Sequence, residues 1–302
     1  MKRKINRVGT STLTVSLPAK WAKMVNLGPG DEIELHEQGH NLIISKDFKP
    51  EIMSNFVDVS GHSTMIHRII AAIYKAGYDE TTIKYGDSKE LQIIQDRIER
   101  NLTGFDAVDY KDDKIIIKSI SELNPDQFES MFKRSFFSLQ DSAHDCVKAL
   151  KNNDYDLLKN IVIRDKNIDR TTDFCRRLLN KGIKDNFKKP LTMYYIIEEI
   201  EIIGDMYKDL SQYVVDKHIK VNKSFIELLE EINSFSDLFI NMIFKFDFEK
   251  MKEFGKERVR LNNKIDDLFD RLDKKDMRVF FYIVQIFNAT FEMKSALITE
   301  NV

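Results

Sequence analysis

The chain is poor in the residues that mark secreted and membrane proteins. Its 302 residues include two cysteines, five prolines and one tryptophan. Cys146 and Cys175 form no CxxC motif and no disulfide framework, which suits a reducing compartment. The longest largely apolar run, at 279–287, is far shorter than the ~20 residues that span a bilayer, and the start MKRKINRVG lacks the apolar core of a secretion signal. We therefore expect a cytoplasmic protein without membrane insertion.

Acidic and basic residues nearly balance, but they are unevenly distributed. The net charge of -2 excludes a uniformly basic nucleic-acid binder and leaves room for a local basic patch. Residues 1–30 contain no Asp or Glu and carry six cations, namely Lys2, Arg3, Lys4, Arg7, Lys20 and Lys23. Such a patch attracts phosphate groups and releases counterions when it binds DNA. The alternative is a soluble basic tail on a dimerisation module.

Glycine and proline are concentrated near the N-terminus. Eight of the eleven glycines lie before residue 105, and no proline follows Pro190. Because both residues favour turns and interrupt helices, this distribution predicts turn-rich structure first and long helices afterwards.

The first 48 residues show the patterns of short strands and one short helix. Leucine and valine alternate with threonine and serine over residues 12–17, which predicts a half-buried strand after a turn at Gly9. Pro18 ends this strand and begins a short helix. Strand patterns resume further along the chain, at 31–35 and 41–45.

The segment RVGTSTLTVSLPAKWAKMVNLGPGDEIEL, at 7–35, resembles the swapped-hairpin domain of the SpoVT/AbrB and MazE type. The order of the glycine turn, strand, Leu-Pro step, helix and Gly-Asp-Glu turn carries the resemblance. It implies a domain over residues 1–48 that forms a homodimer and places its basic strands and loops on DNA. The six cations of residues 1–30 are then the predicted DNA contacts.

Residues 49–122 predict a second, small α/β domain. Strand and helix patterns alternate in the order βαβαββ, at 56–60, 63–77, 81–85, 88–102, 106–110 and 114–120. We expect Ser63 or Thr64 to cap the first helix, and Asp87 or Ser88 to cap the second. Such an order suits a two-layer domain, and we interpret it as a spacer or dimerisation domain because it contains no phosphate loop or catalytic cluster.

Residues 123–302 have helical periodicity and contain an internal repeat. An offset of 97 residues aligns Phe128 with Phe225, and Asp165 and Asp169 with Asn262 and Asp266. An offset of 87 then aligns a later pair of helices, because the first half has an extra connection near 181–190. The fold class is therefore multidomain, ending in an all-α domain of two repeated three-helix bundles at about 125–218 and 222–300.

An acidic stripe marks the third helix of the first repeat. Glu198, Glu201, Asp205 and Asp209 fall within one ~80° sector of a helix, because spacings of three and four residues return to the same face. Isoleucine, methionine and Gly204 border the stripe, and acids within an apolar face need a cationic partner or a metal. Asp165 and Asp169 have the same four-residue spacing, so two helices could present carboxylates to one another.

The segments EIEIIGDMYKDLS and RDKNID, within two three-helix repeats, resemble the PhoU family of phosphate-uptake regulators. With the N-terminal hairpin domain, the chain resembles an archaeal PhoU-like regulator. The resemblance implies metal ions, commonly iron or zinc and sometimes magnesium or manganese, held by Asp165, Asp169, Glu201, Asp205 and Asp209. An all-oxygen site favours hard cations.

Two features limit the metal hypothesis. The second repeat has Asn262 and Asn288 where acids are expected beside Asp266 and Glu292, so we expect it to bind metal weakly or not at all. The acids of the first repeat could instead form salt bridges with Arg164, Arg170 or Arg176.

The leading functional hypothesis is a phosphate-linked transcriptional regulator that binds promoters of phosphate-uptake genes as a dimer, on a pseudo-palindromic operator. Its helical domain would sense phosphate status through a metal or a partner. The alternative is an adaptor that docks on a phosphate ABC transporter or a sensor kinase without contacting DNA. An oxygen-activating or hydrolytic metalloenzyme is the third possibility, but residues 123–302 contain no Glu-x-x-His pair, and we expect no enzyme activity.

Overall fold

The chain forms two compact units, Met1–Glu51 and Ile52–Val302. The computed structural model describes residues 2–38, 41–46, 52–121, 125–182 and 189–302. The predicted boundary after residue 48 falls within 47–51, outside the described residues. The predicted α/β and helical domains lie together in the second unit.

The first unit contains two antiparallel hairpins separated by a short helix. Its elements are β1 (Ile5–Val8), β2 (Thr12–Val15), α1 (Ala19–Met24), β3 (Glu34–Gln38) and β4 (Asn41–Ser45). The turn predicted at Gly9 is confirmed, since this residue joins β1 to β2 with a φ of 69°. Pro18 stands at the N-cap of α1, as predicted for the end of the strand.

Strands β1 and β2 expose their apolar side chains. Ile5, Val8, Leu13 and Val15 have 66%, 57%, 65% and 46% of their surface exposed. The prediction of a half-buried strand is therefore wrong for a single copy of the chain. The physical reason is that the described part of this unit contributes no layer that covers the hairpin.

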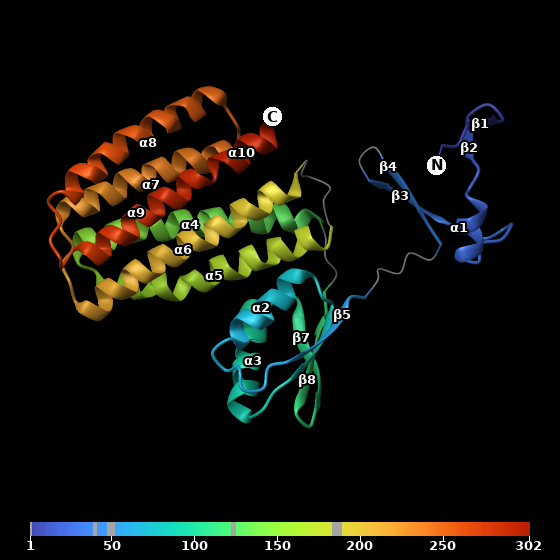
Figure 1. Cartoon of the computed structure of the whole chain (residues 1–302), viewed down its shortest axis with the longest axis horizontal. Helices are drawn as coiled ribbons and strands as arrows, with labels where there is room; N and C mark the ends of the chain where they lie inside the picture. Colours follow the sequence, from blue (N-terminus) through green and yellow to red (C-terminus); the bar gives the residue numbers. More distant parts are fainter. Residues whose placement is uncertain (1, 39–40, 47–51, 122–124, 183–188) are drawn as a thin grey trace. The chain divides into compact units, whose positions relative to one another are not determined.

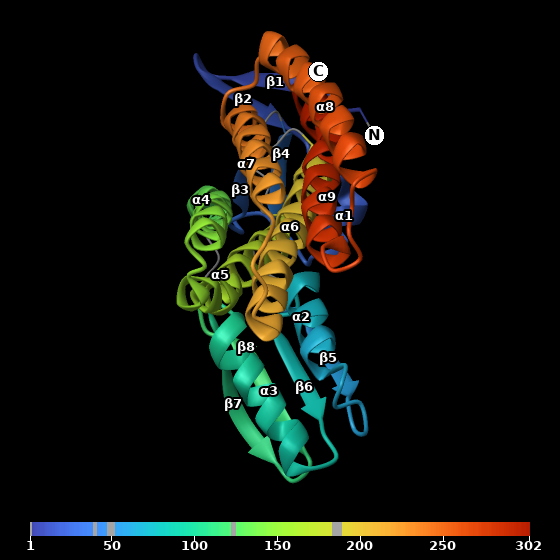
Figure 2. The same cartoon turned by 90° about the vertical axis from the view of Figure 1, so that its left-hand side faces the viewer.

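The second unit begins with a two-layer α/β region in the predicted βαβαββ order (Figure 1). Its elements are β5 (Ser54–Asp58), α2 (Ile66–Ala76), β6 (Glu80–Lys84), α3 (Ser88–Asn101), β7 (Phe105–Lys111) and β8 (Lys114–Ser119). The sheet order is β5-β6-β8-β7, with β5 and β6 parallel and the other neighbours antiparallel. Both helices cover the same face of this sheet (Figure 2), where Ile83, Ile115 and Ile117 are buried.

The two predicted helix caps have different outcomes. Asp87 caps α3 as predicted, because its carboxylate accepts hydrogen bonds from the backbone N–H groups of Lys89 and Glu90, both at 2.9 Å. The predicted cap at Ser63 or Thr64 is wrong, since α2 begins after Met65 without a side-chain cap. The Ser63 hydroxyl instead donates to the buried carboxylate of Glu90 at 3.0 Å.

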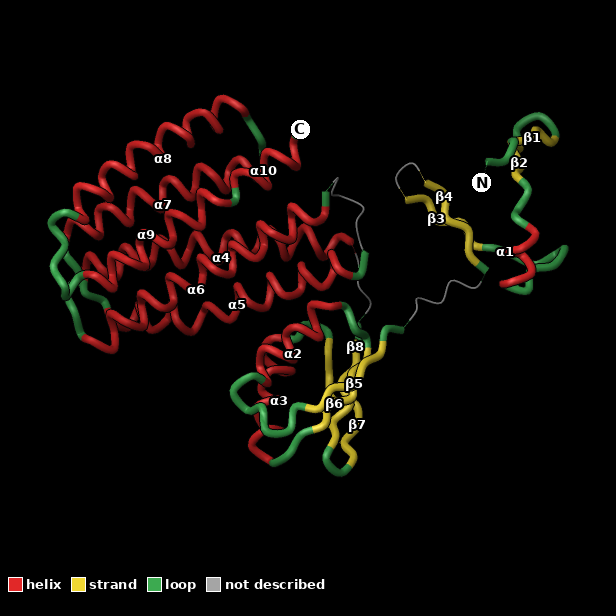
Figure 3. The backbone as a smooth tube through the Cα atoms, viewed as in Figure 1, coloured by secondary structure: helices red, strands yellow, loops and turns green. Residues whose placement is uncertain are grey.

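The remainder of the second unit is helical (Figure 3). Its helices are α4 (Pro125–Asn152), α5 (Tyr155–Asn180), α6 (Pro190–Lys217), α7 (Lys223–Phe244), α8 (Phe248–Phe269), α9 (Met277–Glu292) and α10 (Lys294–Asn301). The first repeat has the three predicted helices, whereas the third helix of the second repeat is interrupted at Met293. The extra connection predicted near 181–190 lies mostly outside the described residues.

The two repeats meet through their first helices, α4 and α7, and through their third helices, where α6 packs against α9 and α10. The amide of Gln140 donates a hydrogen bond to Asp237 at 2.7 Å, and these two residues are 97 positions apart. That separation equals the offset of the sequence repeat, so equivalent positions of the two repeats contact one another. Among the described helices, none is long and apolar enough to cross a membrane.

Helix α5 fastens the α/β region to the bundle. The guanidinium of Arg177 is fully buried and donates hydrogen bonds to the carbonyls of Tyr74 at 3.0 Å and Tyr78 at 2.8 Å. It also pairs with Asp79 at 3.0 Å, and Lys181 donates to the same carboxylate at 2.5 Å. These hydrogen bonds satisfy carbonyls at the C-terminal end of α2. They therefore fix the position of α5 along the end of α2.

Candidate functional site

Three carboxylates converge between α5 and α6. Asp165 and Asp169 project from α5 and Asp205 from α6, and one oxygen of each lies within 4.8 Å of the others. The four-residue spacing on α5 places its two acids on one face, toward the neighbouring helix. The prediction that these two helices present carboxylates to one another is confirmed. We call these three residues the acidic cluster.

Gly204 allows the two helices to approach closely beside the cluster. A Cβ atom at this position would lie 3.1 Å from Cδ1 of Ile168 and 3.4 Å from Oδ1 of Asp165. Only a hydrogen atom fits there without displacing a branched side chain, so the glycine sets the distance between the acids on α5 and Asp205.

A lysine occupies the acidic cluster. The ammonium of Lys208 lies 3.1 Å from Oδ2 of Asp165 and also donates a hydrogen bond to Asp205. Burial alone would lower the pKa of Lys208, but hydrogen bonds and charges from Asp205 and Asp165 outweigh burial and raise its pKa above the usual range. The lysine therefore stays charged and supplies one positive charge to three acids.

Asp169 is the least compensated member of the cluster. Among the described residues it has neither an ion-pair partner nor a hydrogen-bond donor. Burial raises its pKa to about 6, and the charges of Asp165, Asp173 and Asp205 add to this effect. An ionised Asp169 is consequently destabilising, and its negative charge remains available to a cation.

Replacing Asp169 with asparagine should stabilise the protein in a pH-dependent manner. The raised pKa means that the folded state holds the proton more tightly than the unfolded state, so ionised Asp169 costs stability above pH 6 and this cost fades as the pH falls toward 4. Urea unfolding in chelator-treated buffer should show a gain of about 2 kcal/mol at pH 7.5 and a much smaller gain at pH 4.5. Asp209→Asn, an exposed position on the same stripe, is the control and should change little. An equal gain at both pH values would contradict the prediction.

Two other acids of the α6 stripe are paired with a buried arginine. Arg176 is fully buried and its guanidinium lies 2.5 Å from Oε2 of Glu198 and donates to Glu201. The hydroxyl of Thr172 donates a second hydrogen bond to Glu201, at 3.0 Å. The salt-bridge alternative is therefore correct for Glu198 and Glu201. It does not describe the acidic cluster, whose cationic partner is Lys208.

The structure thus brings together three of the five predicted metal ligands. Glu201 lies outside the acidic cluster, and Arg176 holds its carboxylate. Asp209 also lies outside the cluster and is exposed. Sequence reasoning missed Lys208, although its position three residues after Asp205 placed it on the same helix face.

Sequence reasoning also missed Asp173, which continues the four-residue spacing of Asp165 and Asp169. Asp173 is 2% exposed and pairs with Arg176 at 2.9 Å. It also accepts a hydrogen bond from Arg97 of α3 at 3.2 Å and lies 3.7 Å from the ammonium of Lys75 of α2. A continuous network of charges, with the buried pair Asp173 and Arg176 at its centre, therefore links the α6 acids to both helices of the α/β region.

The second repeat lacks this arrangement. Phe291 stands at the position equivalent to Gly204, and the guanidinium of Arg258 lies 4.6 Å from its ring centre and 4.0 Å from that of Phe287. Arg258 also donates to the amide oxygen of Asn288 at 3.0 Å. These side chains fill the space between α8 and α9, which do not share the close backbone approach of α5 and α6.

The predicted DNA contacts lie exposed in the first unit. All six cations, Lys2, Arg3, Lys4, Arg7, Lys20 and Lys23, are exposed, and none forms an ion pair with another described residue. Their charges are therefore available to an external polyanion. The surface combines these cations with the exposed apolar side chains of β1 and β2.

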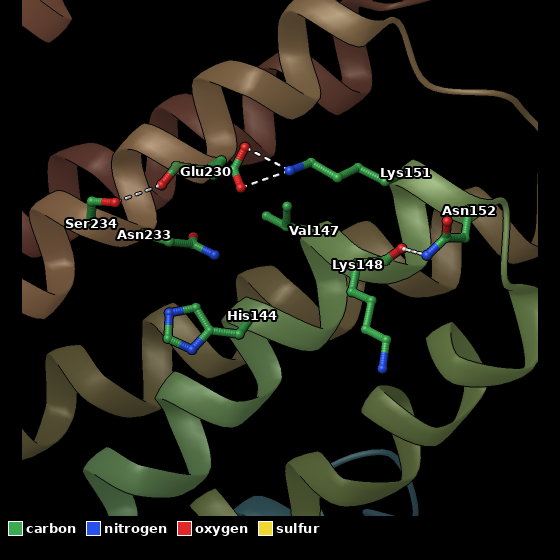
Figure 4. A pocket seen from close by; sticks show the side chains of 8 residues that line it. All are labelled: His144, Val147, Lys148, Lys151, Asn152, Glu230, Asn233 and Ser234. Carbon is green, nitrogen blue, oxygen red and sulfur yellow. Dashed lines mark hydrogen bonds and ion pairs between the residues drawn. The ribbon is translucent and has the colours of Figure 1, made fainter.

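A separate concavity of about 450 Å³ lies between α4 and α7 (Figure 4). Its charged groups are mostly paired across the two helices, since Lys151 donates to Glu230 at 2.6 Å and His144 lies 3.1 Å from Asp237. The concavity shares no residue with the acidic cluster. We interpret it as part of the contact between the two repeats.

Comparison with known families concerns the first unit. Residues 7–50 match the family described as "Antidote-toxin recognition MazE, bacterial antitoxin". The N-terminal segment is MazE-like. The match supports the predicted swapped-hairpin resemblance of the first unit. Comparisons of the chain with curated proteins and with solved structures find no match. The PhoU resemblance is consistent with the helical repeats and stays a prediction.

Proposed function

We propose that this chain is a homodimeric, DNA-binding transcriptional regulator whose helical region binds a cation. The observation that carries the proposal is the set of six exposed cations of the first unit, which have no ion-pair partner among the described residues. Residues 7–50 of this unit are MazE-like, and its first 30 residues contain no acid. Their contacts with DNA phosphates would supply affinity through counterion release. Sequence preference would come from other contacts of the hairpins with base edges.

The exposed apolar side chains of the first unit support a dimer. Ile5, Val8, Leu13 and Val15 are each about half exposed or more in one copy. Burying apolar surface contributes about 25 cal/mol per Å², so a second copy that covers these side chains would stabilise both hairpins. A two-fold dimer matches an operator of two related half-sites.

The acidic cluster fits one hard cation. Asp165, Asp169 and Asp205 offer only carboxylate oxygens, which magnesium, manganese and similar ions prefer. A larger cluster of ions would need Glu201, and Arg176 holds that carboxylate. The bound ion would neutralise part of the negative charge of the acids of α5 and α6. The ion pairs of Asp173 with Arg176 and with Arg97 would transmit this change of charge to the α/β region. The proposed link to phosphate uptake rests on the resemblance of α6 to PhoU.

Fluorescence anisotropy with labelled duplex DNA tests the proposal. The purified chain should bind DNA at low salt, bind promoter fragments of phosphate-uptake genes more tightly than unrelated duplexes, and change its affinity when manganese is added. Absence of binding to any duplex at low salt would contradict the proposed DNA-binding regulator. It would favour the alternative of an adaptor that does not contact DNA. Equal affinity for all duplexes would contradict the proposal that promoters of phosphate-uptake genes are the targets, and would indicate nonspecific DNA binding.

A further inference from the structure

We infer that Lys208 is an internal competitor for the cation at the acidic cluster. In the metal-free protein its ammonium occupies the place of the ion, and binding of the ion displaces it. The inference rests on the proposed cation binding by Asp165, Asp169 and Asp205.

The position of Lys208 makes it the counterion of the cluster. It is on α6, three residues after Asp205, and reaches across to Asp165 on α5. Asp165 is only 6% exposed, so its carboxylate cannot turn to bulk water for compensation. The lysine therefore bridges the two helices with one positive charge, as a cation would.

The ammonium and a metal ion compete for the negative charge of these carboxylates. A cation such as manganese binds carboxylate oxygens directly, at about 2 Å, and Asp165 and Asp205 each have one oxygen that already contacts Lys208. Like charges at that separation also repel strongly in a partly buried site. An arriving ion must therefore exchange with the lysine.

Lys208 has a route out of the cluster. Its side chain is 30% exposed, and the next residue, Asp209, is exposed on the same helix. A long flexible side chain can keep its stem on the protein while its ammonium moves into water. Displacement therefore requires a side-chain rotation and no movement of α5 or α6.

The exchange sets which ions can bind. Three carboxylates and one ammonium have a net charge of -2. A monovalent ion that replaces Lys208 leaves this net charge unchanged, whereas a divalent ion reduces it to -1.

The second repeat supports this role by contrast. The position equivalent to Lys208 there is Ser295, and Asn262 replaces the acid equivalent to Asp165, while Asp266 and Glu292 retain the other two acids. The lysine thus occurs in the repeat that has all three acids.

Manganese binding to chelator-treated full-length protein tests the inference, measured by calorimetry. Lys208→Met should bind manganese at least ~10-fold more tightly than the unaltered chain, because the ion no longer has a competitor. Lys166→Met is the matched control, since Lys166 is exposed and adjacent to Asp165 in sequence but makes no contact with the cluster. It should shift the affinity by less than ~2-fold.

A second measurement uses the unaltered protein and so does not depend on how the variant folds. Acetylation of lysines by an amine-reactive reagent, read by mass spectrometry, should rise at least ~3-fold at Lys208 when manganese is added and stay constant at Lys166. Manganese binding with unchanged labelling of Lys208, or with equal affinity in Lys208→Met, overturns the inference and leaves the cation site standing. Absence of manganese binding in both proteins overturns the cation site and the inference together.

Discussion

Replacing Arg177 with methionine is expected to lower the free energy of unfolding of the Ile52–Val302 unit by about 3 kcal/mol. Methionine keeps part of the packing on the rings of Tyr74 and Phe105, whose centres lie 5.1 Å and 4.7 Å from the guanidinium. It removes the hydrogen bonds to two carbonyls of the α/β region and one ion pair with Asp79. Buried carbonyls without donors cost stability even though Lys181 still compensates Asp79.

The loss should be local as well as global. Hydrogen exchange should show faster opening of α2 and β6, because Arg177 connects them to α5, while α4 and α7 keep their protection. Arg170→Met is the matched control on the same helix, since Arg170 is partly exposed and has no partner among the described residues. A Tm and an exchange pattern that match the control would show that α5 does not hold the α/β region in place.

Neutralising the N-terminal cations should weaken DNA binding by about 10³-fold at 100 mM salt. The variant changes Lys2, Arg3, Lys4 and Arg7 to glutamine, which removes four exposed positive charges from the first unit of each copy of the chain. Each phosphate contact that is lost also flattens the dependence of log K on log salt by about one unit. Anisotropy titrations at several salt concentrations measure both quantities.

A control of equal charge separates local contact from net charge. Lys217, Lys250, Lys256 and Lys274 are exposed on the helical region, and changing them to glutamine alters the total charge by the same amount. This control should keep its DNA affinity within about threefold, because its lysines lie outside the unit whose cations are proposed to contact the phosphates. If both variants lose affinity equally, the hairpins are not the DNA-binding surface.

Local patterns predicted much of the fold. The alternation of strand and helix over 54–119, the cap at Asp87 and the turn at Gly9 follow from backbone preferences that act over a few residues. The repeat predicted which helices would correspond. The wrong prediction of a cap at Ser63 shows the limit of such patterns. The Ser63 hydroxyl donates its hydrogen bond to Glu90, a buried carboxylate of another helix.

The acidic cluster was predictable only in part. Three- and four-residue spacings placed the acids on the correct faces of α5 and α6, and Gly204 marked the point of closest approach. Spacing along one helix cannot say which acid meets which cation on the next helix. Packing of the two helices paired Lys208 with Asp165 and Arg176 with Glu201. The predicted five-ligand site is therefore divided into a cluster of three acids, the salt bridge of Glu201, and Asp209, which is exposed.

The sequence by itself determined the order of the elements, the basic start of the chain and the faces on which its acids lie, because each of these depends on neighbours a few residues away. Tertiary structure decided the pairing of charges between α5 and α6 and the closing of the equivalent space in the second repeat by Phe291 and Arg258. The physical reason is that a buried charge is stabilised by whichever partner the packing brings within a few ångströms, and the relative placement of two helices depends on the whole core.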